Sequence, residues 1–187
     1  MNRLALTALS IAFALPAAAE PESFTIDPNH TFPSWEISHS GVSVQRGRFN
    51  KTSGKVVIDT AARTGSAEVV IDVASVDTGH ARLGEHLRSA DFFDVARFPT
   101  LNFKSTSFAF EGDKVKSVAG EFTLLGVAKP VTLNAVTYNC IQPPNKKKVC
   151  GGDFMAVIKR SDWGMTKLIA GTSDEVMLHV SIEALKD

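Results

Sequence analysis

Alternation of apolar and polar residues occurs through most of this chain, and it is interrupted once, between Ser75 and Phe103. Segments on both sides, such as residues 67–73 and 176–184, place apolar side chains on one face and polar ones on the other. This period of two is typical of strands with one buried face. The interruption has apolar residues spaced as in a short helix followed by a turn: Leu83, Leu87, Phe92, Phe93, Val95 and Phe98. The pattern predicts an all-β fold with one short helical insertion.

The expected strands are short and evenly spaced, which favours a closed barrel or a sandwich. We expect about eight strands, with a break at Gly54 and a link at Gly126 and Pro130. The helix is expected to begin at Thr78 or Gly79 and to end at residues 97–99, because the residue before a proline avoids the α region. An eight-stranded barrel has room for one small ligand, so ligand binding is the first function to consider. The expected strand segments are 24–26, 35–39, 48–59, 67–73, 101–110, 115–125, 131–138, 151–159 and 176–184.

The first 19 residues have the pattern of a secretory signal peptide. Arg3 supplies a positive charge, residues 4–15 form a short apolar run, and Ala17 to Ala19 provide small residues for cleavage. The apolar run is too short to span a membrane. We therefore expect cleavage near Ala19, a mature domain covering residues 20–187, and a periplasmic location.

Composition argues against a nucleic-acid partner. The chain has 20 Lys and Arg residues and 20 Asp and Glu residues, whereas nucleic-acid binders normally carry a basic excess. Lys146, Lys147 and Lys148 form a basic cluster in a proline-containing loop. The cluster is interpreted as a solvated hairpin tip, with a polyanion or lipid-headgroup site as the alternative.

Cys140 and Cys150 are the only cysteines. In an oxidising compartment such an isolated pair predicts a disulfide bond, here across the tip of a long hairpin. Closing a loop of this length stabilises a fold by roughly 3 kcal/mol in the chain-entropy treatment.

Motifs for catalysis or metal binding are weak. The chain has no G-x-S-x-G sequence. Ser40 follows His39 on an expected strand, so the two side chains point to opposite faces. His80 and His86 lie six residues apart, which does not match the i, i+4 spacing of a helical zinc motif. We expect no required cofactor, no metal site and no catalytic residue.

Motifs in order along the chain resemble the YceI family of bacterial periplasmic proteins. The insertion contributes S-V-D-T at Ser75–Thr78, H-L-R-S-A-D-F-F-D-V at His86–Val95 and F-P at Phe98–Pro99. The remaining motifs are I-D-P-N-H-T at 26–31, R-G-R-F-N at 46–50, G-E-F-T-L-L-G-V-A-K-P-V at 120–131 and R-S-D-W-G-M at 160–165. The resemblance implies a lipocalin-like antiparallel barrel whose apolar pore holds a polyisoprenoid lipid.

Polar residues beside aromatic ones are candidates for contact with a ligand headgroup. His39 shares a strand face with Trp35, so it is either a hydrogen-bonded core histidine or a headgroup contact. Arg88 either pairs with Asp91 or Asp94, or binds a phosphate through its guanidinium group. Arg160 lies in a connection that either closes one end of the barrel or contacts ligand.

Large apolar side chains are candidates for the pore lining, with plain core packing as the alternative for each. Phe92 and Phe93 are the strongest of these, because adjacent helical residues cannot both point at the same part of a core. The full set is Trp35, Phe49, Phe92, Phe93, Phe98, Phe103, Phe122, Trp163 and Met165.

The expected function is to hold a polyisoprenoid, such as an isoprenoid quinone or a polyprenyl phosphate, for transport or storage. Burial of a long apolar tail gains roughly 25 cal/mol per Å², so a carrier through water must enclose it. One alternative is a non-catalytic interaction or stress-response module that assists a membrane redox or lipid-handling protein. The other is an enzyme acting on a lipid headgroup, with His39 or an aspartate as its acid-base group. A homodimer is a further option that the sequence does not test.

Overall fold

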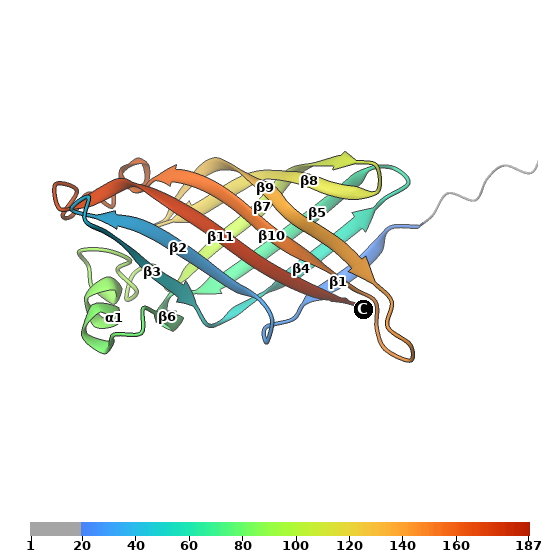
Figure 1. The fold of residues 1–187 in the computed structure, drawn as a ribbon, viewed down its shortest axis with the longest axis horizontal. Helices are drawn as coiled ribbons and strands as arrows, with labels where there is room; N and C mark the ends of the chain where they lie inside the picture. The colour runs from blue at the N-terminus through green and yellow to red at the C-terminus, as the bar shows by residue number, and fades with distance from the viewer. Residues whose placement is uncertain (1–19) are drawn as a thin grey trace, which may run out of the picture.

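The computed structural model describes residues 20–187, which form one closed antiparallel barrel with a single α-helix (Figure 1). The expected signal peptide, residues 1–19, lies outside the described residues. The elements are β1 Glu22–Ile26, β2 Phe32–His39, β3 Ser43–Phe49, β4 Thr52–Asp59, β5 Thr64–Asp72, η1 Val73–Ser75, β6 Val76–Asp77, α1 Ala81–Arg88, β7 Thr100–Glu111, β8 Lys114–Leu124, β9 Val127–Ile141, β10 Val149–Lys159, η2 Arg160–Trp163 and β11 Thr172–Lys186.

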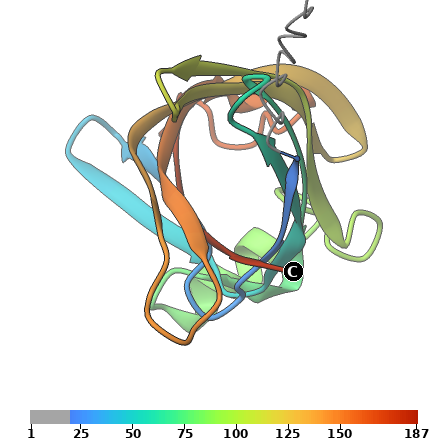
Figure 2. The ribbon, with the colours of Figure 1, turned by 90° about the vertical axis from the view of Figure 1, so that its right-hand side faces the viewer.

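The strands occupy eight positions around the barrel, as predicted. β1 and β2 follow each other along β11, where Phe24 pairs with Lys186 and Phe32 pairs with Ser181. β4 pairs with β1, and β3 pairs with β2. On their other sides, β5 pairs with β4 and β6 pairs with β3. Three positions are thus each made of two strand segments, and β7 to β11 supply the other five. Figure 2 shows the closed ring from its disulfide-bearing end.

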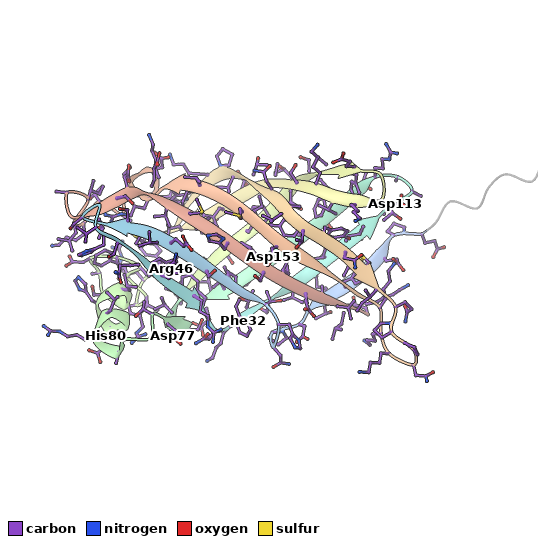
Figure 3. The ribbon with its side chains drawn as sticks, in the orientation of Figure 1. Phe32, Arg46, Asp77, His80, Asp113 and Asp153 are labelled. Atoms are coloured by element: carbon purple, nitrogen blue, oxygen red, sulfur yellow. A yellow bond between two sulfur atoms is a disulfide. The ribbon has the colours of Figure 1, made fainter. Side chains whose placement is uncertain are left out.

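The two ends of the barrel differ. The helix α1 lies at one end with the β2–β3 turn and the connection from β10 to β11, and we call this the helix end (Figure 1). The β9–β10 hairpin tip lies at the opposite end, where Cys140 and Cys150 form the expected disulfide bond. Figure 3 places His80, next to α1, and Asp113, in the β7–β8 turn, at these opposite ends. We call the second the disulfide end.

The helix is shorter than predicted. The Nδ1 atom of His80 accepts a hydrogen bond from the backbone of Leu83, which starts α1 at Ala81. The helix stops at Arg88, because Ser89 is extended and its hydroxyl donates to the carbonyl of His86 at 2.7 Å. Residues 89–98 form turns, with Asp94 at a positive φ of 45°. Within residues 20–187, no helix is long and apolar enough to cross a bilayer.

Two of the predicted breaks are also wrong. Pro130 lies inside β9 and pairs with Glu121, while β10 pairs with β9 only from Asn134 onward, so no ladder bond on that side is lost. Gly54 lies inside β4 with φ of 153°, and a Cβ there would be 2.0 Å from the carbonyl oxygen of Glu68. This glycine permits close approach of β4 and β5 rather than ending a strand.

Candidate binding cavity in the barrel

The barrel encloses a cavity of about 450 Å³ that extends from the helix end toward the middle, here called the main cavity. Ligand sites in proteins commonly measure about 300–1,000 Å³. Inward side chains of the strands form its wall, and α1, the turns after it and the β10–β11 connection cover it. Its lining residues are Pro33, Ser34, Trp35, Ile37, His39, Gln45, Phe49, Val69, Ile71, Leu83, His86, Leu87, Phe92, Phe93, Leu101, Phe103, Phe122, Leu124, Val131, Leu133, Ile158, Arg160, Met165, Leu168, Thr172, Val176, Leu178 and Val180.

The wall of the main cavity is almost wholly apolar. Its polar members are Ser34, His39, Gln45, His86, Arg160 and Thr172. Within residues 20–187, no aspartate or glutamate lines it. An aliphatic chain would therefore meet hydrocarbon on every side, and a carboxylate would not repel an anionic group at its mouth.

The main cavity opens at the helix end. His39, Gln45, His86 and Leu168 line it and are also exposed to solvent. His86 contacts the ring of Phe92 edge to face, with a centroid distance of 4.8 Å. Polar groups are therefore concentrated where the cavity meets water, and apolar groups line its interior.

Most of the residues that the sequence nominated line the main cavity. They are Trp35, His39, Phe49, Phe92, Phe93, Phe103, Phe122, Arg160 and Met165. Phe92 and Phe93 both lie in the turns after α1, and this irregular backbone lets adjacent side chains reach the same cavity. The argument that adjacent residues must diverge assumed a helix that the structure does not have at this point.

Three nominated residues lie elsewhere. Nη1 of Arg88 donates to the carbonyl of Val76 at 3.3 Å, and neither expected aspartate is its partner. Asp91 pairs with Lys167 and Asp94 with Arg97. Arg88 thus connects α1 to β6.

Phe98 and Trp163 pack outside the main cavity lining. The guanidinium group of Arg97 lies 5.0 Å from the Phe98 ring centre. Trp163 is 4% exposed and its Nε1 donates to the carbonyl of Phe122 at 3.1 Å. These rings support the wall and the cover of the cavity from behind.

Arg160 is a structural arginine at the rim of the main cavity. Its side chain is buried, and burial lowers its pKa from the usual arginine value. The guanidinium donates to the carbonyls of Ser173, Met165, Lys167 and Thr172 and to the hydroxyl of Thr172, at 2.7–3.3 Å. These bonds use all five of its N–H groups, so Arg160 fixes the cover and has no donor left for a headgroup.

Sequence reasoning missed the aliphatic part of the wall because it nominated aromatic and polar residues only. Two of the missing side chains share strand faces with nominated ones, Leu124 with Phe122 and Leu101 with Phe103, and the others lie on alternating strands from which no residue was nominated. Following each alternating face for its whole length would have found Val69, Ile71, Leu101, Leu124, Val131, Leu133, Ile158, Val176, Leu178 and Val180.

The model of the YceI-like domain family matches residues 24–184, which is nearly all of the described chain. The chain belongs to the YceI family. The resemblance in the motifs is thereby confirmed. Protein YceI of Salmonella arizonae and that of Salmonella paratyphi B are each 36% identical to it over 188 residues, covering 99% of this chain and 97% of the relative.

Solved structures of YceI-type barrels have the same fold. BcnA of Burkholderia cenocepacia aligns with a TM-score of 0.71 and 28% identity, covering 84% of this chain and 98% of that one. The YceI protein of Campylobacter jejuni aligns with a TM-score of 0.70 and 27% identity, covering 81% and 90%. A Saccharophagus degradans domain described as polyisoprenoid binding aligns with a TM-score of 0.64 and 18% identity, covering 89% and 99%, which shows a common fold.

Groups for metal or acid-base chemistry are sparse in the described part of the chain. Residues 20–187 contain no cluster of three or more His, Cys, Asp or Glu side chains suited to a metal ion. Arg46 pairs with Glu36 on the outer face of the barrel, where Figure 3 shows Arg46.

Proposed function

We propose that this YceI-family barrel binds a single isoprenoid-type lipid, with its tail in the main cavity and its headgroup at the helix end. The observation that carries the proposal is the main cavity itself, whose wall is almost wholly apolar and whose solvent-exposed lining includes His39, Gln45 and His86. The polyisoprenoid-binding description of the Saccharophagus degradans domain supports the same ligand class.

Burial of the tail supplies the binding energy in this proposal. Each CH₂ group transferred from water contributes about 0.8 kcal/mol, and the apolar wall of the main cavity would enclose such a tail. His39, Gln45 and His86 offer hydrogen bonds to a headgroup oxygen, such as that of a quinone carbonyl or a phosphate. No catalytic step and no cofactor form part of the proposal.

The cellular role extends the proposal. Secretion by the expected signal peptide would place the protein in the periplasm, where a lipid that leaves one membrane needs an enclosed site before it reaches another. Transport and storage both use such a site. A membrane redox or lipid-handling partner stays a prediction, and a homodimer stays an option that the sequence does not test.

Binding of a delipidated protein to a prenyl alcohol tests the proposal. Phe93→Asn places an amide in the cavity wall, while Val136→Asn makes the same kind of change on β9 at a side chain that is 60% exposed. We expect tight binding by the wild type and by Val136→Asn, and at least tenfold weaker binding by Phe93→Asn. Equal binding by all three, or no binding by the wild type, would contradict the proposed site.

A further inference from the structure

A second, smaller cavity of about 80 Å³ lies beyond the main cavity toward the disulfide end. Apolar side chains form nearly all of its wall, among them Phe24, Val118, Phe154 and Ile182. Tyr138 and Cys150 also line it. The Tyr138 hydroxyl lies 3.3 Å from the sulfur of Cys140, and burial raises the pKa of Tyr138 to about 12. The small cavity is thus a neutral apolar space at the disulfide end of the same barrel.

Four residues line both cavities and so form the partition between them: Val69, Phe103, Leu133 and Val180. They come from β5, β7, β9 and β11: β5 and β7 are neighbours, where Val69 pairs directly with Phe103, and β9 and β11 lie farther round the ring. We call these four residues the dividing layer.

Phe103 is the largest side chain in the dividing layer, and its ring has little room on one side. A Cβ at Gly120 would lie 2.6 Å from its Cζ atom, so the ring packs against the glycine backbone of β8. Val69 on β5 and Phe122 on β8 are its cross-strand neighbours. Phe103 is 8% exposed, so its ring is buried within the layer.

We propose that the dividing layer, chiefly Phe103, sets the length of the isoprenoid tail that this protein binds. This inference rests on the proposed function. A tail that enters from the helix end gains contacts with each isoprene unit until it reaches the layer. Units beyond that point cannot reach the apolar wall of the small cavity unless Phe103 moves, so affinity stops rising with chain length.

The test compares farnesol, geranylgeraniol and solanesol, prenyl alcohols of increasing length, on the delipidated mature protein. Phe103→Ala joins the two cavities, and Phe103→Leu does so in part with less loss of packing. Phe122→Ala is the matched control, because Phe122 is the cross-strand neighbour of Phe103 but lines the main cavity only. Circular dichroism and thermal unfolding confirm that each variant is folded.

In the wild type we expect the affinity to rise at least tenfold from farnesol to geranylgeraniol, the two shorter alcohols, and then to level off. In Phe103→Ala and Phe103→Leu the levelling point should move to a longer alcohol, and in Phe122→Ala it should not. The same levelling point in all four proteins would overturn the role of the layer while the binding function stands. Failure of the wild type to bind any of the alcohols would overturn the proposed function and this inference together.

Discussion

The indole Nε1 of Trp163 donates a hydrogen bond to the backbone carbonyl of Phe122 across 3.1 Å. The two rings also meet edge to face, with a centroid distance of 5.8 Å. Trp163 belongs to the cover at the helix end and Phe122 to the barrel wall, so this pair fastens the cover of the main cavity to β8.

Trp163→Phe should therefore destabilise the protein. It removes a buried hydrogen bond and part of a packed ring, and loss of a buried hydrogen bond costs about 1–3 kcal/mol. Urea denaturation measures the change. Trp35→Phe is the comparison, because Nε1 of Trp35 is buried without a hydrogen-bond partner in the described part of the chain. Its removal should cost less, and an equal loss in both variants would contradict the role of the Trp163 bond.

Gly47→Ala should weaken ligand binding. A Cβ at Gly47 would lie 2.3 Å from Cζ2 of Trp35, so the indole ring must shift from its place against β3. Because Trp35 lines the main cavity, the shift changes the space for a tail. Overpacking of this kind costs about 1–3 kcal/mol of folding free energy. Titration with geranylgeraniol measures the affinity. Gly84→Ala on α1 is the control, since its nearest contact would be the flexible end of Arg88 at 3.4 Å; equal affinities for the two variants would refute the prediction.

The strand pattern follows from alternation, which predicted it but left a closed barrel or a sandwich open. The resemblance to the YceI family implied the barrel, and the structure has it. The split of three ring positions was harder to predict, because it depends on which strand lies beside which. Thr31 illustrates this: it is fully buried and exchanges hydrogen bonds with Glu183, far along the chain. Likewise, the aromatic residues of the site were recognisable as apolar, but Arg160 resembled a ligand contact until its carbonyl partners were seen.

Removal of the disulfide should affect stability more than binding. The bond joins Cys140 to Cys150 at the end of the barrel opposite the mouth of the main cavity. The double variant Cys140→Ala, Cys150→Ala should lose about 3 kcal/mol of unfolding free energy in urea. Reduction of the wild type by a thiol should give a similar loss. A large loss of affinity for geranylgeraniol in a folded double variant would contradict the placement of the ligand at the helix end.

Acid should loosen the disulfide end. The Asp187 carboxylate accepts hydrogen bonds from Ser23, Thr25 and Lys55, which hold its pKa well below the usual 3.8. A depressed folded-state pKa stabilises the protein above the unfolded value, and this contribution is lost as pH falls through the folded value. Below about pH 4 the melting temperature of the wild type should therefore fall more steeply than that of Asp187→Asn.

The matched control for acid sensitivity is Asp113→Asn, which removes a carboxylate from the same end of the barrel (Figure 3), in the turn between β7 and β8, neither of which pairs with β1. It should keep the steep acid dependence of the wild type. Parallel curves for the wild type and Asp187→Asn would show that this group of hydrogen bonds does not control acid stability.

Native mass spectrometry of the protein purified from its own source, followed by organic extraction and identification of the lipid, tests the binding function most directly. The account predicts one isoprenoid per chain, present in the wild type and in Val136→Asn and much reduced in Phe93→Asn. Protein that is empty as purified and that also takes up no added isoprenoid would contradict it.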